Sequence, residues 1–197
     1  MEKLGRLEQI IANNQLTLEK FDIVKFAPCR FIGKSVYARG FQLKGSGEIF
    51  RSLKEQSAWI FDLLDELKEY ATDETNDAAL LTWDKYCDKT GLLGFTVGRF
   101  MKADTPVPIA DTSPSDPETD MDYFDLPETY IAKGWLRGKM KTVLYHSLTE
   151  KLVYDEIERQ GYKPTQSKFM AEIYPKQDDE NNPIYGFYMP CDLENSK

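Results

Sequence analysis

Two parts of this chain repeat the same order of predicted elements, and the repeat restricts the possible folds more than any other feature. Residues 37–41 (YARGF) and 131–135 (IAKGW) match at four consecutive positions. Each precedes a predicted long helix and then two predicted strands. We therefore expect an α+β fold with two duplicated β-α-β-β halves, related by a pseudo-twofold axis. Both halves would share one antiparallel sheet, with two long helices on one face and a ligand groove on the other, along the seam.

Apolar spacing defines the elements of both halves. The first helix is predicted from about 47 to 70, with Phe50, Leu53, Ile60, Phe61, Leu64 and Leu67 at helical spacing, and Ser46 as a candidate N-cap. The second is predicted over about 139–160 and ends at Gly161. Strands are expected within 22–41 and over 79–86, 92–101, 129–137, 168–174 and 184–190. A short amphipathic helix is predicted within residues 1–20, and the main domain over 21–191.

The segment 103–128 differs from the rest of the chain. It contains eight acidic residues, no Lys or Arg, and five prolines. Prolines at this density exclude a helix or a central strand, so we expect an acidic insertion. Without it the chain has 25 acidic and 25 basic residues, although the whole chain carries a net charge of −8. This charge argues against direct nucleic-acid binding.

Several familiar motifs are incomplete. FIGKS (31–35) lacks the first glycine of a phosphate-binding loop, where Pro28 stands, and DPETDMD (116–122) lacks the glycine and distal glutamate of a calcium loop. The only histidine, His146, has no ligand spacing around it, and the three cysteines are far apart. We therefore expect no metal and no cofactor. The lack of a long apolar stretch or signal peptide predicts a cytoplasmic protein that does not enter a membrane.

One acidic side chain lies inside an apolar, strand-like run, FMAEIYP (169–175). A buried carboxylate needs a partner or a ligand, because an unpaired charge in a dry interior is prohibitive. Strand alternation puts Glu172 and Tyr174 on the face opposite Ala171 and Ile173. If Ala171 and Ile173 cover the helices, Glu172 looks into the seam.

The same alternation predicts a candidate binding site around Glu172. Its aromatic members are Tyr174, Tyr188, Trp135, Phe41, Trp83 and Tyr86. A carboxylate framed by aromatic rings suits a flat apolar cation, because the carboxylate compensates the charge and the rings add cation–π attraction. The simpler interpretation remains open: Glu172 pairs with a nearby lysine or arginine, and the aromatic side chains fill the core.

The chain also resembles a known family. The end, KFMAEIYPKQDD…NPIYGFYMPC, resembles the closing strands of GyrI-like small-molecule-binding domains, where a Glu-x-Tyr strand precedes an aromatic strand ending in proline. The matching positions are Glu172, Tyr174, Tyr188 and Pro190. LPETYIAKGWLRG (126–138) resembles the family's strand before its second helix. The resemblance covers about 22–190.

The resemblance implies a cavity for hydrophobic, often cationic compounds, with Glu172 at its centre. Family members occur as effector-binding domains of AraC-type and MerR-type regulators, as free-standing proteins and as an inhibitor of DNA gyrase; some hydrolyse cyclopropane-bearing toxins. Residues 1–20 supply at most one helix and therefore no helix-turn-helix, so we expect a free-standing member.

Three functions follow as hypotheses. The first is a sensor or sequestering protein for hydrophobic xenobiotics, cationic aromatic compounds included. The second is a hydrolase of reactive xenobiotics, with Glu172 as the catalytic acid or base. The third is a protein-interaction module, such as a topoisomerase modulator, that uses the acidic segment; a homodimer is also open.

Overall fold

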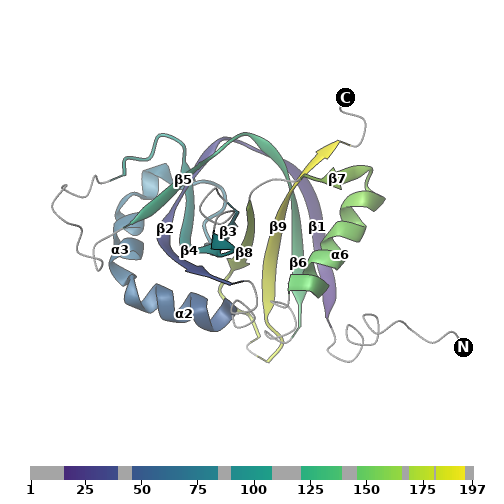
Figure 1. Ribbon diagram of the computed structural model, residues 1–197, viewed down its shortest axis with the longest axis horizontal. Helices are drawn as coiled ribbons and strands as arrows, with labels where there is room; N and C mark the ends of the chain where they lie inside the picture. The colour runs from purple at the N-terminus through teal and green to yellow at the C-terminus, as the bar shows by residue number, and fades with distance from the viewer. Residues whose placement is uncertain are drawn as a thin grey trace, which may run out of the picture.

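A computed structural model describes residues 16–39, 46–83, 90–107, 121–138, 146–165, 169–179 and 181–193. Mixed helices and strands confirm the α+β class (Figure 1). The helices are α2 (Ser46–Gln56), α3 (Ala58–Glu66), the 3₁₀ turn η2 (Lys68–Tyr70) and α6 (His146–Arg159). The strands are β1 (Thr17–Phe26), β2 (Cys29–Ala38), β3 (Asp77–Thr82), β4 (Leu93–Lys102), β5 (Asp122–Leu126), β6 (Thr129–Arg137), β7 (Tyr162–Pro164), β8 (Phe169–Tyr174) and β9 (Ile184–Leu193).

The strand order confirms the duplication. The nine-stranded antiparallel sheet runs β1-β6-β9-β8-β3-β4-β2-β5, with β7 added beside β9. From one edge, β1 of the first half is followed by β6, β9 and β8 of the second half. From the other edge, β5 of the second half is followed by β2, β4 and β3 of the first half, in the equivalent order. Strands β3 and β8 therefore meet at the centre. Compared with the predicted three strands, each half has an additional first strand, β1 or β5, which crosses to the edge of the opposite half; the second half also has the short strand β7.

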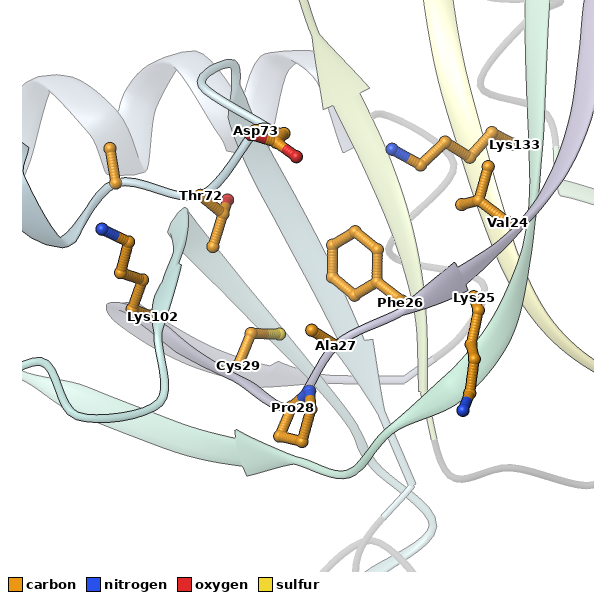
Figure 2. A pocket seen from close by; sticks show the side chains of 11 residues that line it. Val24, Lys25, Phe26, Ala27, Pro28, Cys29, Thr72, Asp73, Lys102 and Lys133 are labelled. Carbon is orange, nitrogen blue, oxygen red and sulfur yellow. The ribbon is translucent and has the colours of Figure 1, made fainter.

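The crossing strands explain two differences from the sequence prediction. The predicted strand-rich stretch 22–41 divides at Pro28 into β1 and β2, since proline supplies no N–H to a ladder (Figure 2). The predicted insertion 103–128 is not wholly an insertion, because Asp122–Leu126 form the edge strand β5. Pro127 follows β5 as Pro28 follows β1. Both connections thus carry a proline where the chain leaves one half for the other.

Among the described residues, α2, α3 and α6 cover one face of the sheet, which we call the helix face. Phe50 and Leu53 of α2 pack on β3 and β4, and Val153 and Ile157 of α6 pack on β6 and β9. The predicted helix 47–70 is not continuous. It breaks at Ser57, whose φ of −116° and ψ of 32° are not helical; its hydroxyl and its backbone N–H both donate to the Leu53 carbonyl.

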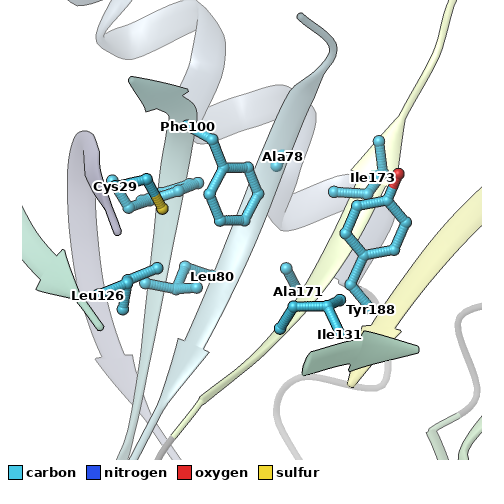
Figure 3. Packing of buried hydrophobic residues seen from close by; sticks show 10 residues of the cluster. Cys29, Ala78, Leu80, Phe100, Leu126, Ile131, Ala171, Ile173 and Tyr188 are labelled. Atoms are coloured by element: carbon cyan, nitrogen blue, oxygen red, sulfur yellow. The ribbon is translucent and has the colours of Figure 1, made fainter. Parts of the chain in front are cut away.

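The opposite face, which we call the inner face, has its own apolar cluster. Figure 3 shows Phe100, Leu80, Ala171 and Tyr188 in this cluster, which draws on strands of both halves. The rings of Phe26 on β1 and Phe100 on β4 meet edge to face at 5.6 Å, although β1 is an edge strand and β4 lies on the other side of the central pair β8 and β3. The sheet is therefore buried on both faces.

Some predicted features lie wholly or mostly outside the described residues. These are the N-terminal helix, most of the acidic segment, Phe41, Tyr86 and the beginning of the predicted helix 139–160. None of the described helices has the length and apolar character needed to cross a membrane.

Candidate functional site

The two faces of β8 are occupied the other way round from the expectation. Alternation holds, but Ala171 and Ile173 lie in the inner-face cluster, with Tyr188 (Figure 3). Met170 and Tyr174 pack against the clusters of the helix face, so Glu172 between them also points toward the helices. The prediction failed because both faces of β8 are apolar. Hydrophobicity alone could not say which face the helices cover.

Glu172 is fully buried, and part of its hydrogen bonding comes from its own strand. The hydroxyl of Tyr174 donates to Oε2 of Glu172 at 2.5 Å. The Tyr174 ring is in turn stacked on Phe50 of α2, with centroids 3.6 Å apart and planes within 9°. The partner identified for the carboxylate is therefore a tyrosine held in place by a helix.

A cavity of about 400 Å³ opens on the helix face beside α6. Its lining is mostly aromatic rings and thioethers, with one carboxylate: Trp83, Glu150, Tyr154, Pro164, Thr165, Phe169, Met170 and Met189. Trp83 is the predicted site residue that lines it. Met170 lies two residues before Glu172 on the same face, so Glu172 is adjacent to the cavity along β8.

Glu150 is the charged group of this cavity. It is partly buried, and loss of water raises its pKa above the usual value for a glutamate. The nearby carboxylate also contributes to raising the pKa of Tyr154, after burial. Among the described residues, no hydrogen bond or ion pair reaches Glu150. A carboxylate in these surroundings is poised to accept a positive charge.

The inner face holds the other two predicted residues, around a different carboxylate. The rings of Trp135 and Tyr188 meet edge to face at 6.0 Å. The Tyr188 hydroxyl donates to Glu74, which is 6% exposed and which Asn76 also contacts, at 2.9 Å. Burial, and secondarily Glu74, raise the pKa of Tyr188 far above its usual range.

The structure therefore separates the predicted site. Glu172, Tyr174 and Trp83 lie on the helix face, and Trp135 and Tyr188 on the inner face. Sequence reasoning missed Glu150 and Glu74. Glu150 had a usable signal, because it precedes the buried Val153 and Ile157 by three and seven positions and so falls on the apolar stripe of α6.

The described residues offer little for a metal ion. No group of three or more His, Cys, Asp or Glu side chains within them is arranged to hold one.

Comparisons with known proteins give the fold a context. No family model matches the chain, and no curated protein sequence does. Solved structures do match. A proposed transcription regulation protein from Staphylococcus aureus MU50 has a TM-score of 0.57 at 14% identity, over 87% of this chain and 97% of that one. SAV2435 bound to tetraphenylphosphonium has a TM-score of 0.55 at 12% identity, over 88% and 94%. A hydrolase from Listeria innocua has a TM-score of 0.50 at 12% identity, over 89% and 93%. At these identities the likeness establishes a shared fold.

Proposed function

We propose that this protein is a small-molecule-binding module of the GyrI-like type, acting as a sensor or sequestering protein for lipophilic aromatic cations. The observation that carries the proposal is the helix-face cavity. Its walls are rings and thioethers, and its one carboxylate, Glu150, has no partner among the described residues. The bound tetraphenylphosphonium of the structural neighbour SAV2435 has this chemistry.

The cavity suits such a ligand in size and in chemistry. About 400 Å³ falls within the range of pockets for drug-sized molecules, roughly 300–1,000 Å³. The rings of Trp83 and Tyr154 offer faces for cation–π attraction, and the thioethers of Met170 and Met189 adapt to irregular apolar shapes. A delocalised cation loses little hydration on entering, and it restores the charge balance of a desolvated carboxylate.

Glu172 contributes at longer range in this proposal. It lies two residues after Met170 on β8, is fully buried and is bonded to Tyr174, so it acts on the cavity without requiring ligand contact. Glu150 supplies the direct counter-charge. An opposite charge at about 5 Å in a partly solvated protein site is worth at most about 3 kcal/mol, which sets the scale of the expected effect.

Calorimetric titration with tetraphenylphosphonium and with neutral triphenylphosphine oxide tests this assignment. We expect Glu150→Gln to weaken the cation by about tenfold or more and the neutral compound by much less. The matched control is Glu158→Gln, an exposed glutamate on the same helix. Equal weakening of both ligands would remove Glu150 as the counter-charge, and saturable binding of neither ligand would overturn the proposed function.

A further inference from the structure

A second cavity, of about 420 Å³, lies at one end of the inner face, on the other side of the sheet from the Glu150 cavity. Four parts of the chain form it: the β1–β2 connection with the adjoining strand ends, the loop before β3, the end of β4, and β6 (Figure 2). Its lining residues are Val24, Lys25, Phe26, Ala27, Pro28, Cys29, Ala71, Thr72, Asp73, Lys102 and Lys133. None of the described residues predicted for the cation site lines this cavity, although the Tyr188 ring contacts its lining residue Lys133.

Lys133 is the distinctive group here. Its side chain is only 19% exposed, and Figure 2 shows its ammonium pointing into the space above Phe26. The nitrogen lies 5.3 Å from the ring centroid of Phe26 and 4.7 Å from that of Tyr188. Its nearest carboxylate oxygen, on Glu74, is 3.6 Å away, beyond a normal hydrogen bond. None of the described residues accepts a hydrogen bond from this ammonium.

Glu74 does not need the donors of Lys133. Tyr188 donates to one of its oxygens, and the side chain of Asn76 donates to the other at 2.9 Å. The ammonium of Lys133 is largely withdrawn from water and forms a long ion pair with Glu74, so its N–H groups still favour an acceptor. The acceptor has room in the cavity that Lys133 faces.

The remaining lining favours an anion that has an apolar body. Three lysines line the cavity against one carboxylate, Asp73, which is exposed. The ammonium of Lys102 donates to the backbone carbonyl of Glu69 at 2.7 Å, whereas Lys25 is already paired with a glutamate. Burial raises the pKa of the Cys29 thiol to about 12, so this thiol stays neutral and does not repel an anion.

We propose that the inner-face cavity binds a small organic oxyanion, a carboxylate or phosphate monoester on a flat apolar group. Its acidic oxygens accept hydrogen bonds from Lys133, and its apolar part lies against Phe26 and Pro28. This site is separate from the cation cavity in both position and charge.

Two-dimensional amide NMR titrations of the whole chain test the site with benzoate, phenyl phosphate and inorganic phosphate at constant ionic strength. We expect saturable shifts at 24–29 and 71–73 with the two aromatic anions. We also expect binding at least about tenfold weaker for inorganic phosphate, which has no apolar part. Whichever aromatic anion binds more tightly identifies the acidic group that the site prefers.

Two variants make the test specific. Lys133→Gln removes the charged donor and should weaken both aromatic anions by about tenfold or more, whereas Lys151→Gln, an exposed lysine on α6, should leave their affinity unchanged. Ala27→Trp adds an indole to the cavity wall and leaves every charged lining residue in the chain; it should abolish binding, which covers the case that Lys133→Gln unfolds the protein.

The outcomes separate this proposal from the proposed function. Absence of saturable shifts, equal weakening by both lysine substitutions, or inorganic phosphate binding as tightly as benzoate would each overturn the oxyanion site. Tetraphenylphosphonium, titrated in parallel, should shift residues of β8 and α6 equally in the wild type and in Lys133→Gln. That result is independent of whether any anion binds.

Discussion

Tyr174→Phe should measure what the buried carboxylate of Glu172 gains from its own strand. The substitution removes only the hydroxyl that donates to Glu172 at 2.5 Å. The ring keeps its stacking on Phe50 and its edge contact with Tyr185, so no large cavity forms. The loss is therefore the hydrogen bond itself, together with the cost of a buried carboxylate left with one donor fewer.

The expected size follows from the charge and the burial. A hydrogen bond to a charged group contributes about 1.5–3 kcal/mol, against about 1 kcal/mol for a neutral pair. Glu172 is 0% exposed, so water cannot replace the missing donor. For a chain of this length, each kcal/mol changes Tm by about 2–4 °C. Tyr174→Phe should therefore lower Tm by about 3–12 °C.

Thermal and urea unfolding of a double-mutant cycle with Glu172→Gln provide the assay. In the Glu172→Gln background the same tyrosine substitution should cost only about 1 kcal/mol, because the remaining bond is neutral. Tyr185→Phe is the matched control, since no hydrogen bond joins its hydroxyl to another residue in the described part of the chain. Equal losses for Tyr174→Phe and Tyr185→Phe, or a cycle without coupling, would refute the reasoning.

Three further outcomes follow from the structure. Because loss of water raises the pKa of Glu150, the folded state binds its proton more tightly than the unfolded chain; Glu150→Gln should therefore raise Tm at pH 7, and this gain should vanish in unfolding scans below pH 4.5. Gly98→Ala would place its Cβ 1.9 Å from the Ile32 carbonyl oxygen, so β2 and β4 must separate. We expect the free energy of unfolding in urea to fall by about 3 kcal/mol. An unfolding midpoint equal to that of the wild type would contradict the close approach of the two strands. Burial raises the pKa of Cys29 to about 12 and of Cys191 to about 11, so iodoacetamide at pH 8 should leave both unmodified in the native protein, as peptide mass spectrometry can check.

The duplicated architecture could be predicted from the order of elements, but not the exchange of β1 and β5 between halves. That exchange depends on long-range strand pairing, which leaves no local pattern. The two copies of the motif that suggested the repeat also occupy different positions in their strands. Ala38 is the last residue of β2, whereas Ala132 is the fourth of nine residues in β6.

The motif around Ala132 has a packing explanation instead. Ala132 and Gly134 face α6, and a Cβ on Gly134 would lie 2.8 Å from Val153 Cγ2. Small residues at alternate positions of β6 mark where the helix approaches the sheet most closely. Strand alternation then assigns Lys133 and Trp135 to the inner face. The face on which these two side chains lie could therefore be predicted from the small residues beside them.

The same physical rule decides which carboxylate is available to a ligand. A sheet buried on both faces leaves every polar side chain inside it dependent on a partner supplied by the fold. Glu172 has Tyr174, and Glu74 has Tyr188 and Asn76. Within the described part of the chain, Glu150 loses water on folding and acquires no such partner. An unusual glutamate in an apolar strand drew attention to Glu172, but its burial and its bond to Tyr174 make it a poor first contact for a cation. The desolvated carboxylate on α6 is the stronger basis for the proposed cation site, which would lie between α6 and the ends of β3 and β8.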